Sequence, residues 1–529
     1  MLNTPTARKG MVTSPHHLAS QAGVQVLKDG GTAIEAAVAV AACLAVVYPQ
    51  MTSIGGDNFW LIAQPGTDPI AIDACGRTGA AVDIAMYERH NLSSIPKRGP
   101  LASNTVAGAI SGWDAALGIS GKWQSPLPLD RILRDAIDYA ENGFCVTVHQ
   151  RDFTAKRLAE LKPVRGFADS FLIDGEVPRR GDIMVQKRLG RTLRRLAEDG
   201  LDGFYRGALS RLVAADLEEV GAPITRDDLN AHYPVIQAPL SVQVSGARLF
   251  NTPPPTQGLS SLMILALFDR LGMNIADEFQ HLHGIVEATK QAYLVRDREI
   301  CDPAFMQQDA ATFLSDHVLD GLAAKIDKRV ALPWPAPQNS GDTVWIGVVD
   351  GEGRAVSLIQ SHYFEFGSGI VLPQTGINWQ NRGASFSLDP KVRNHLRPRA
   401  RPLHTLNPAM AQFDDGRFMT YGTMGAEGQP QTQAAIFSRY AWLKTELQAA
   451  VTAPRWLLGR AAGETSTTLK LESRFSPEAV SALKSSGHDV ELMPPFTSLM
   501  GHAGAIVRHP NGVLEGATDP RSDGAVAAW

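Results

Sequence analysis

Apolar and polar residues alternate over several short stretches of this chain, and a period of two predicts β-strands. The clearest stretch follows Thr343, where residues 344, 346 and 348 share one face and residues 345, 347 and 349 share the other. After a turn at 350–353 the apolar pattern returns at 355–360, which predicts a β-hairpin. Further strands are predicted at 11–14, 59–63, 69–73 and 240–249.

Elsewhere apolar residues recur every three or four positions, which predicts helices that bury one face. Residues 33–47 are almost wholly apolar, so we expect a helix buried on all sides, with Thr32 as its cap. Other helices are predicted at 18–29, 129–142, 186–197, 259–271, 279–298, 431–445 and 476–486. Strands followed by helices and then by strands predict an α+β fold in which helices cover sheets.

The composition is that of a large folded protein rather than a disordered one. Of 529 residues, 44% are hydrophobic and 20% are charged, and the net charge is −4. Nucleic-acid binding usually needs a basic excess, which is missing here. The longest apolar run, residues 36–47, is too short to span a bilayer, and the first residues lack the apolar core of a signal peptide. We therefore expect a cytoplasmic protein with neither nucleic acid nor membrane as a partner.

Metal and cofactor signatures are not evident in the sequence. Four cysteines lie far apart and form no C-x-x-C pair, so neither a disulfide framework nor a zinc cluster is expected: Cys43, Cys75, Cys145 and Cys301. His281 and His283 are two residues apart near the start of a predicted helix, where they cannot share a face. The sequence has neither a phosphate-binding loop nor a dinucleotide-binding fingerprint. The prediction is a protein without a metal or a cofactor.

Thr343 is a candidate nucleophile because of the segment that precedes it. Residues 331–342 are polar, rich in proline and without periodicity, which predicts a flexible linker. Scission after Asp342 would leave Thr343 with a free amine beside its hydroxyl, and a hydroxyl with its own amine as base is a compact nucleophile. The alternative is ordinary turn chemistry at the start of a strand.

Several motifs occur in the same order as in one known family. They include Ile54-Gly55-Gly56, Pro253-Pro254-Pro255, the Asp342-Thr343 hairpin, Phe366-Gly367-Ser368-Gly369 and Asp519-Pro520-Arg521. Over nearly its whole length the chain resembles the gamma-glutamyltransferase family of N-terminal nucleophile hydrolases. The resemblance implies a four-layer αββα sandwich and a precursor that cleaves itself between Asp342 and Thr343. The products would be a large subunit, 1–342, and a small subunit, 343–529, which together form one αββα unit. Whether two such pairs assemble into a dimer of heterodimers stays open.

The resemblance also implies roles for residues around the nucleophile. Tyr421-Gly422-Thr423-Met424-Gly425-Ala426 matches the oxyanion loop of the family, so the backbone N–H groups of Gly425 and Ala426 are expected to stabilise the tetrahedral intermediate. Ala426 replaces a glycine of the family, and because alanine still has its N–H we expect it to keep this role if its φ is negative. Ser361 matches a hydroxyl that supports the nucleophile. The alternatives are a plain turn at 425–426 and a serine that only satisfies its own backbone.

The expected substrate pocket departs from the family at several positions. Cys75 replaces an arginine, Tyr363 an asparagine, Ser385 an aspartate, and His404-Thr405 a pair of serines. A gamma-glutamyl substrate carries an α-ammonium group, and without a carboxylate at 385 nothing evident would pair with it. These residues are expected to line the pocket, and their identities argue against a gamma-glutamyl substrate.

Other residues of this region suit a small amide that bears a carboxylate. Arg382 can hold a carboxylate by two hydrogen bonds, and further candidate donors are His362, Tyr363, His404 and Thr405. The alternatives are a structural ion pair for Arg382 and ordinary hydrogen bonds for the histidines. Trp379-Gln380-Asn381-Arg382-Gly383-Ala384 and Gly428-Gln429-Pro430-Gln431-Thr432-Gln433 are similar to the oxamate amidohydrolase branch of the family.

That branch belongs to purine nitrogen catabolism, and the similarity implies hydrolysis of oxamate to oxalate and ammonia. Two alternatives remain at this point. One is a gamma-glutamyl hydrolase or transferase, or an acylase, with a rebuilt pocket. The other is a homologue that is not processed and serves as a binding protein.

Overall fold

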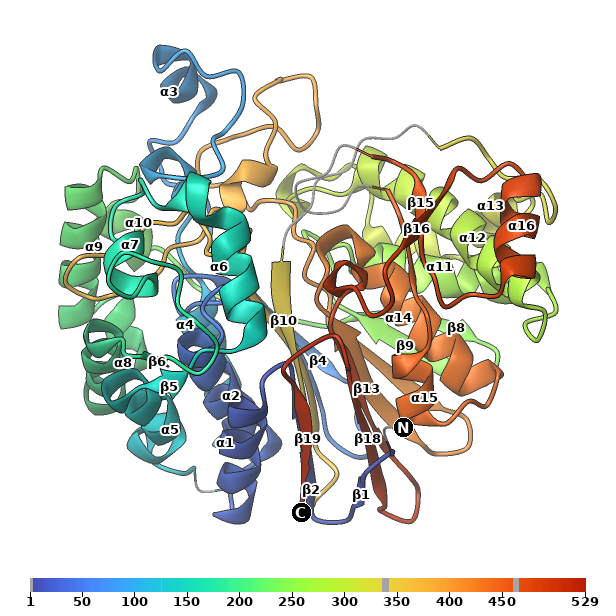
Figure 1. The fold of residues 1–529 in the computed structure, drawn as a ribbon, viewed down its shortest axis with the longest axis horizontal. Helices are drawn as coiled ribbons and strands as arrows, with labels where there is room; N and C mark the ends of the chain where they lie inside the picture. The colour runs from blue at the N-terminus through green and yellow to red at the C-terminus, as the bar shows by residue number, and fades with distance from the viewer. Residues whose placement is uncertain (1–2, 125, 335–341, 460–465) are drawn as a thin grey trace.

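Two antiparallel sheets lie face to face at the centre of the computed structural model, with helices on both outer sides (Figure 1). The structure describes residues 3–124, 126–334, 342–459 and 466–529. One sheet has the order β19 (Ala525–Ala528), β2 (Gly10–Ser14), β10 (Asp342–Asp350), β11 (Ala355–Tyr363), β3 (Asp57–Ala63), β4 (Ile70–Ala74) and β7 (Val235–Gln237). The other has the order β1 (Thr6–Ala7), β18 (Leu514–Thr518), β17 (Ala503–Arg508), β13 (Phe418–Thr423), β12 (Ala409–Phe413), β9 (Ala247–Asn251) and β8 (Leu240–Val244).

The helices divide between the two outer layers. Those on the side of the β10 sheet are α1 (His17–Lys28), α2 (Ala33–Val47), α4 (Ala109–Ser120), α5 (Leu129–Asn142), α6 (Val148–Leu161), α7 (Phe167–Phe171), α8 (Lys187–Asp199), α9 (Ala208–Val220) and α10 (Arg226–Asn230), with α3 (Ile84–Arg89) projecting beyond them. Those on the side of the β13 sheet are α11 (Gly258–Leu271), α12 (Glu278–Glu299), α13 (Asp316–Ala323), α14 (Gln429–Phe437), α15 (Leu447–Thr452) and α16 (Pro477–Ser485). Two small sheets complete the fold, β5 (Phe144–Cys145) with β6 (Ile183–Met184), and β14 (Trp456–Leu458) with β15 (Leu469–Glu472) and β16 (Val490–Met493).

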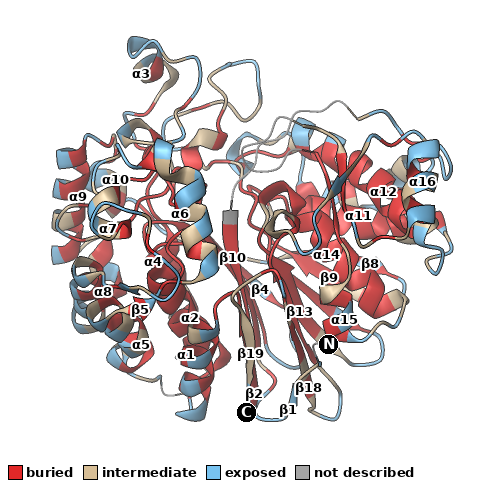
Figure 2. Ribbon diagram, viewed as in Figure 1, coloured by how far each residue is buried: buried red, intermediate tan, exposed pale blue. Residues whose placement is uncertain are grey.

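The hydrophobic core forms three layers because each sheet is apolar on both faces. One layer joins the β10 sheet to helices such as α2, whose residues are all buried (Figure 2). A second joins the β13 sheet to α11 and α12. Between the sheets, Met11, Val349, Phe250 and Ile506 belong to a third cluster. The expected four-layer αββα sandwich is therefore confirmed, and burial of both faces explains why the strands contain few polar residues.

The hairpin that begins at Thr343 has the predicted face assignment. Val344, Ile346 and Val348 pack on the helical layer, whereas Trp345 and Val349 face the opposite sheet. β10 pairs with β11, and the register shifts between Asp342 and Val344. This irregularity places Thr343 in a β-bulge, a feature that re-aims side chains at the ends of strands.

Two predicted elements differ in the structure, and a third prediction lies mostly outside the described residues. Residues 240–249 form a hairpin, β8 and β9, rather than one strand, because Gly246 adopts a φ of +81° and turns the chain. The helix expected at 431–445 begins earlier as α14 and continues as a π-helical turn, Ser438–Trp442. The linker expected at 331–342 falls mostly on residues 335–341, which lie outside the described residues.

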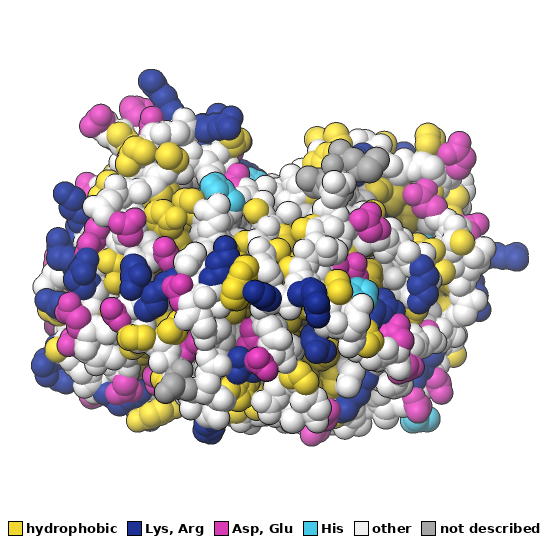
Figure 3. Space-filling model, turned by 90° about the horizontal axis from the view of Figure 1, so that it is seen from below, with side chains coloured by type: hydrophobic (Ala, Val, Ile, Leu, Met, Phe, Trp, Pro, Cys, Tyr) yellow, Lys and Arg dark blue, Asp and Glu magenta, His cyan; other side chains and the backbone are white. Residues whose placement is uncertain are grey.

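Charge is spread over the surface rather than gathered. The face seen in Figure 3 carries Lys and Arg side chains interspersed with Asp and Glu side chains, in keeping with the small net charge of −4. Within the described parts of the chain, none of the helices combines the length and the apolar character that a bilayer span requires.

Candidate active site

Thr343 lies at the buried start of β10, and its side chain faces the beginning of α14. Only 1% of its surface is exposed. Its Oγ1 accepts a hydrogen bond from Gln429 Nε2 at 3.3 Å. Gln429 is the first residue of α14, so the helix begins beside the candidate nucleophile. The partial positive charge of a helix N-terminus favours negative charge that develops nearby.

Ser361 lies on β11, next to the strand that carries Thr343. Its Oγ accepts a hydrogen bond from the backbone N–H of Tyr363 at 2.8 Å. Tyr363 has a φ of +84°, a left-handed conformation that is rare for a large side chain. The serine therefore stabilises the turn that ends β11, and support of the nucleophile stays a prediction.

The turn between β13 and α14 contains the two expected oxyanion donors. Gly425 has a φ of +119° and Ala426 a φ of +45°, so the negative φ on which the role of Ala426 was made conditional is not present. The chain has to reverse within two residues to pass from the strand into the short helix Ala426–Gly428, and this requires left-handed backbone. Among the described residues, no hydrogen bond is recorded from either backbone N–H, so both are available to donate to an oxyanion, and that role stays a prediction.

A buried polar network beneath this turn holds it in place, and the sequence analysis did not reveal it. Gln257 Nε2 donates to the carbonyl of Ala426 at 2.7 Å, while its Oε1 accepts from Arg296 at 3.0 Å. Arg296 also forms an ion pair with Glu427. Although burial opposes the charged form, this carboxylate holds the pKa of Arg296 above its usual value. Gln257 precedes α11, Arg296 lies on α12 and Glu427 lies in the turn, so no local sequence pattern could have joined them.

Arg382 is buried beside Tyr363 at the end of β11. Its Nε donates to the carbonyl of Leu403 at 2.9 Å, and one terminal nitrogen lies 3.3 Å from Thr405 Oγ1. Its guanidinium carbon lies 3.9 Å from the centre of the Tyr363 ring. Within the described residues, no carboxylate lies at ion-pair distance from it, and burial lowers the pKa of Arg382. The alternative of a structural ion pair therefore has no support in this geometry.

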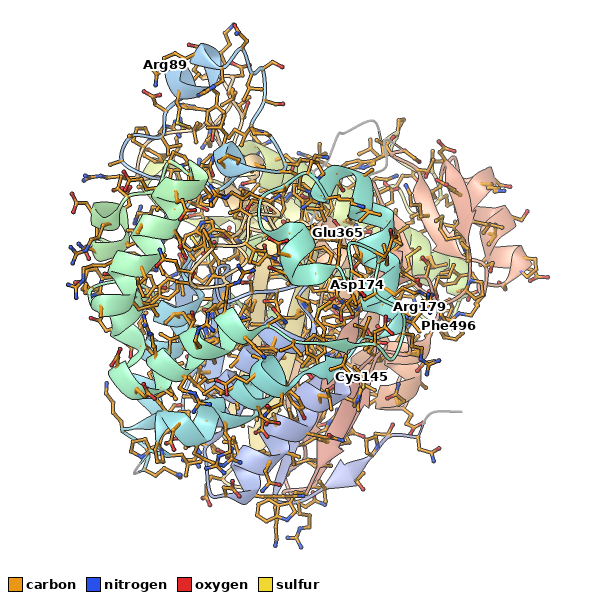
Figure 4. All side chains as sticks on the ribbon, turned by 60° about the vertical axis from the view of Figure 1, so that its left-hand side comes forward. Arg89, Cys145, Asp174, Arg179, Glu365 and Phe496 are labelled. Atoms are coloured by element: carbon orange, nitrogen blue, oxygen red, sulfur yellow. The ribbon has the colours of Figure 1, made fainter. Side chains whose placement is uncertain are left out.

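The loop that leads from β11 to Arg382 is anchored on the helical layer. Glu365, labelled in Figure 4, forms an ion pair of 2.7 Å with Arg157 of α6. Arg98 donates to the carbonyl of Glu365 at 2.6 Å. Asn381 accepts a hydrogen bond from the backbone of Phe364 at 3.1 Å, so both ends of the loop are tied together.

His404 is paired with Asp57, which the sequence analysis did not single out. His404 Nε2 lies 3.0 Å from Asp57 Oδ2, and the other carboxylate oxygen accepts three N–H groups, from Gly76, Gly108 and Gln380. Burial raises the pKa of Asp57 to about 7 and holds the pKa of His404 well below its usual value. The His404 Nδ1 atom has no partner among the described residues. His404 is therefore a neutral imidazole with one nitrogen available.

The remaining predicted positions differ in how they are used. Cys75 packs in an apolar cluster with Trp345, and burial raises the pKa of its thiol well above the usual value. His362 Nε2 lies 3.0 Å from the carbonyl of Pro49, which favours an ordinary structural hydrogen bond. The buried hydroxyl of Ser385 has no partner within the described residues. Tyr363, Arg382 and Thr405 are linked by contacts, and Thr343 contacts Gln429, whereas Cys75 and His362 are engaged elsewhere.

One buried group has the composition of a metal site. His283, Glu287 and His488 place their ligand atoms within 4.8 Å of one another. However, His283 Nδ1 and His488 Nε2 are hydrogen-bonded at 2.9 Å, and the Lys290 ammonium lies 2.6 Å from Glu287. A cation there would have to displace this ammonium. We therefore interpret the group as a hydrogen-bonded network that also holds the backbone of Leu332.

Comparison with known proteins gives consistent matches over the whole chain. A model of the gamma-glutamyltranspeptidase family matches residues 19–529. An oxamate amidohydrolase proenzyme of Klebsiella pneumoniae is 52% identical, and the alignment covers 100% of both chains. A glutathione hydrolase-like proenzyme of Bacillus subtilis is 41% identical over 98% of each chain. A solved cephalosporin acylase from Bacillus halodurans is similar with a TM-score of 0.91 and 32% identity, covering 100% of this chain and 97% of that one.

Proposed function

The chain belongs to the gamma-glutamyltranspeptidase family of N-terminal nucleophile hydrolases, and from this premise we propose that it is a self-processing threonine amidohydrolase acting on oxamate or a similar small amide. As a member of this family it is a hydrolase of amide C–N bonds. The related proenzymes support two subunits from one precursor, and Asp342–Thr343 is the proposed cleavage site.

The proposed reaction uses Thr343 twice. In the precursor, its Oγ1 attacks the carbonyl of Asp342, and hydrolysis of the resulting ester frees the amine of Thr343. An α-amine has an ordinary pKa of about 7.7–8.0, which suits a base near neutral pH. In the mature enzyme this amine takes the hydroxyl proton as Oγ1 bonds to the substrate carbonyl. The C–N bond then breaks, the proton passes to the leaving nitrogen as ammonia, and water hydrolyses the acyl-enzyme to a carboxylate.

The observation that carries the substrate class is the Arg382 guanidinium, which is buried and lacks a carboxylate at ion-pair distance among the described residues. A buried cation is costly unless an anion pairs with it. A substrate carboxylate would supply that anion, with the hydroxyl of Thr405 as a further donor. Oxamate has a carboxylate directly beside its amide and no ammonium group, so it needs no acidic partner at Ser385. The 52% identical oxamate amidohydrolase proenzyme supports the same choice.

The first prediction concerns Thr343. Thr343→Ala removes the attacking oxygen, so the precursor should stay uncut and should release no ammonia from oxamate. Denaturing gels and an ammonia assay measure both effects. N-terminal sequencing of the wild-type small fragment should read Thr-Val-Trp. Two bands in the Thr343→Ala variant would refute self-cleavage by this residue.

A substrate panel separates oxamate from the alternatives. Ammonia release from oxamate is compared with p-nitroaniline release from a gamma-glutamyl anilide and with hydrolysis of a cephalosporin amide, because the similar proteins include an acylase. Preference for the anilide or the cephalosporin would overturn the oxamate proposal and keep the amidohydrolase class. A wild-type protein that stays uncut and inactive would instead favour an unprocessed binding protein.

A further inference from the structure

Gln429 is the one side chain that the described structure records in a hydrogen bond with the hydroxyl of Thr343, and half of its amide is unused. Its Nε2 lies 3.3 Å from Thr343 Oγ1. Its Oε1 is buried and has no partner among the described residues. The side chain is fully buried, so solvent does not reach this oxygen.

Two other buried glutamines of α14 provide a comparison. Gln431 accepts from the Leu458 backbone N–H at 2.8 Å and donates to the Leu458 carbonyl at 3.2 Å. Gln433 donates to the carbonyl of Asn407 and accepts from the hydroxyl of Ser261. Both use their two amide ends within the protein. Gln429 Oε1 is therefore an open acceptor beside the candidate nucleophile, available to a partner that arrives with the substrate.

Resting on the function proposed above, we infer that Gln429 is a catalytic residue that bridges the nucleophile and the leaving nitrogen. Its Nε2–H occupies one lone pair of Thr343 Oγ1 and stabilises the negative charge that develops there. This contact leaves the hydroxyl proton to the α-amine. Its Oε1 accepts an N–H of the substrate carboxamide and orients that nitrogen to receive the proton as the C–N bond breaks.

This arrangement makes a prediction about substrate class. A primary carboxamide has two N–H groups, so it can donate to Gln429 Oε1 throughout the reaction. An ester of the same acid has no such donor, although it forms the same acyl-enzyme with Thr343. Gln429 should therefore favour amides over esters, which distinguishes it from a residue that only supports the fold.

The test compares oxamate with the monoethyl ester of oxalic acid, which shares its acyl group. Gln429→Met removes both hydrogen bonds while keeping a side chain of similar length. We expect kcat/KM for oxamate to fall about 100-fold, because both hydrogen bonds are lost and each is worth about tenfold. For the ester we expect a loss about tenfold smaller, because only the contact with Thr343 is removed. Rates are divided by the fraction of protein that carries the small subunit starting at Thr343.

Gln431→Met is the matched control, because it is a buried glutamine of the same helix that does not contact Thr343. This variant should lower the unfolding temperature and change kcat/KM for the amide and for the ester by the same factor. Equal losses on amide and ester in Gln429→Met, or a loss of less than about threefold on oxamate, would overturn the inference. A folded Gln429→Met variant that stays uncut would support it, since the same oxygen attacks Asp342 in the precursor.

The inference and the proposed function can fail separately. If the wild-type protein does not hydrolyse oxamate, the oxamate proposal fails. The amide-to-ester ratio is then measured on the primary amide of the panel that the protein does hydrolyse, together with the ester of the same acid.

Discussion

At the scale of single residues, the site is defined by groups whose hydrogen bonds are incomplete. Two other buried arginines of this protein are paired with acids, Arg521 with Glu472 at 2.6 Å and Arg455 with Asp519. Arg382 instead contacts a carbonyl, a hydroxyl and an aromatic ring. Such contacts hold the guanidinium in place without neutralising it, so its charge remains available to a bound anion.

The second prediction follows from that charge. Arg382→Gln should raise KM for small carboxylate amides about 10- to 100-fold, the range expected for losing a charged hydrogen bond. Steady-state kinetics on the processed protein measures this. Arg354→Gln is the control, because Arg354 lies in the turn of the β10–β11 hairpin and already has Asp350 at 2.6 Å. An unchanged KM in Arg382→Gln would remove Arg382 from the substrate site.

At the scale of elements, the site depends on where strands end and helices begin. Thr343 begins β10, Tyr363 ends β11 and Gln429 begins α14. The strands are held on one side by α2, whose N-terminus has a complete capping box. Thr32 Oγ1 accepts from the N–H of Glu35, and the Glu35 carboxylate accepts from the N–H of Thr32. Both side chains are buried, so water cannot replace these bonds.

The third prediction tests this cap. Thr32→Ala should lower the free energy of unfolding by about 1–2 kcal/mol, since a lost cap costs about 0.5–2 kcal/mol and burial places it at the upper end. Urea denaturation measures the change. Thr225→Ala removes a capping box of the same kind on α10, which Thr225 forms with Asp228. Thr225 is exposed, so water can replace the lost hydrogen bond, and the free energy of unfolding should fall by less. Equal effects in the two variants would show that burial of the cap does not matter.

At the scale of the whole molecule, burial of histidines links stability to pH. Burial lowers the pKa to about 3 for four histidines and to about 4 for a fifth: His16, His232, His281, His488 and His362. They stay neutral in the folded protein but gain protons below about pH 6.5 when it unfolds. Their contribution to stability is therefore complete above that pH and is lost as the pH falls toward 4. Asp57, with a pKa of about 7, acts in the opposite direction, as do Asp114, Asp350 and Glu427, whose pKa values burial also raises.

The fourth prediction is a loss of stability in mild acid. The urea midpoint should fall between pH 7 and pH 5. Each of these histidines adds about 1.4 kcal/mol per pH unit to the slope of the unfolding free energy against pH, once it is fully protonated in the unfolded state. His281→Asn should reduce the slope by about that amount. His281 contacts Ser438 at 2.9 Å and lies away from Thr343, so the amidase reaction is a separate readout. A midpoint that does not change with pH would contradict the prediction.

Much of the architecture was predictable from local pattern. The face assignment of the hairpin at 344–349, the buried helix at 33–47 and its cap at Thr32 were all predicted, because backbone periodicity and capping are determined by neighbouring residues. The order of motifs also led to the family and to Thr343 as the candidate nucleophile. Residues 240–249 were misjudged because the turn at Gly246 is short and the pattern on either side is similar.

What only the tertiary structure decided is which polar groups meet and which remain unpaired. Gln429 and Thr343 are 86 residues apart in the chain, and Asp57 and His404 are 347 apart. Whether Arg382 has a counter-ion, and whether Ala426 has a positive φ, depends on how separate elements close around them. The sequence alone determined the chemical groups and the strands and helices that carry them, because those depend on near neighbours. Burial and pairing depend on contacts across the fold, and these set the charge and availability of each group.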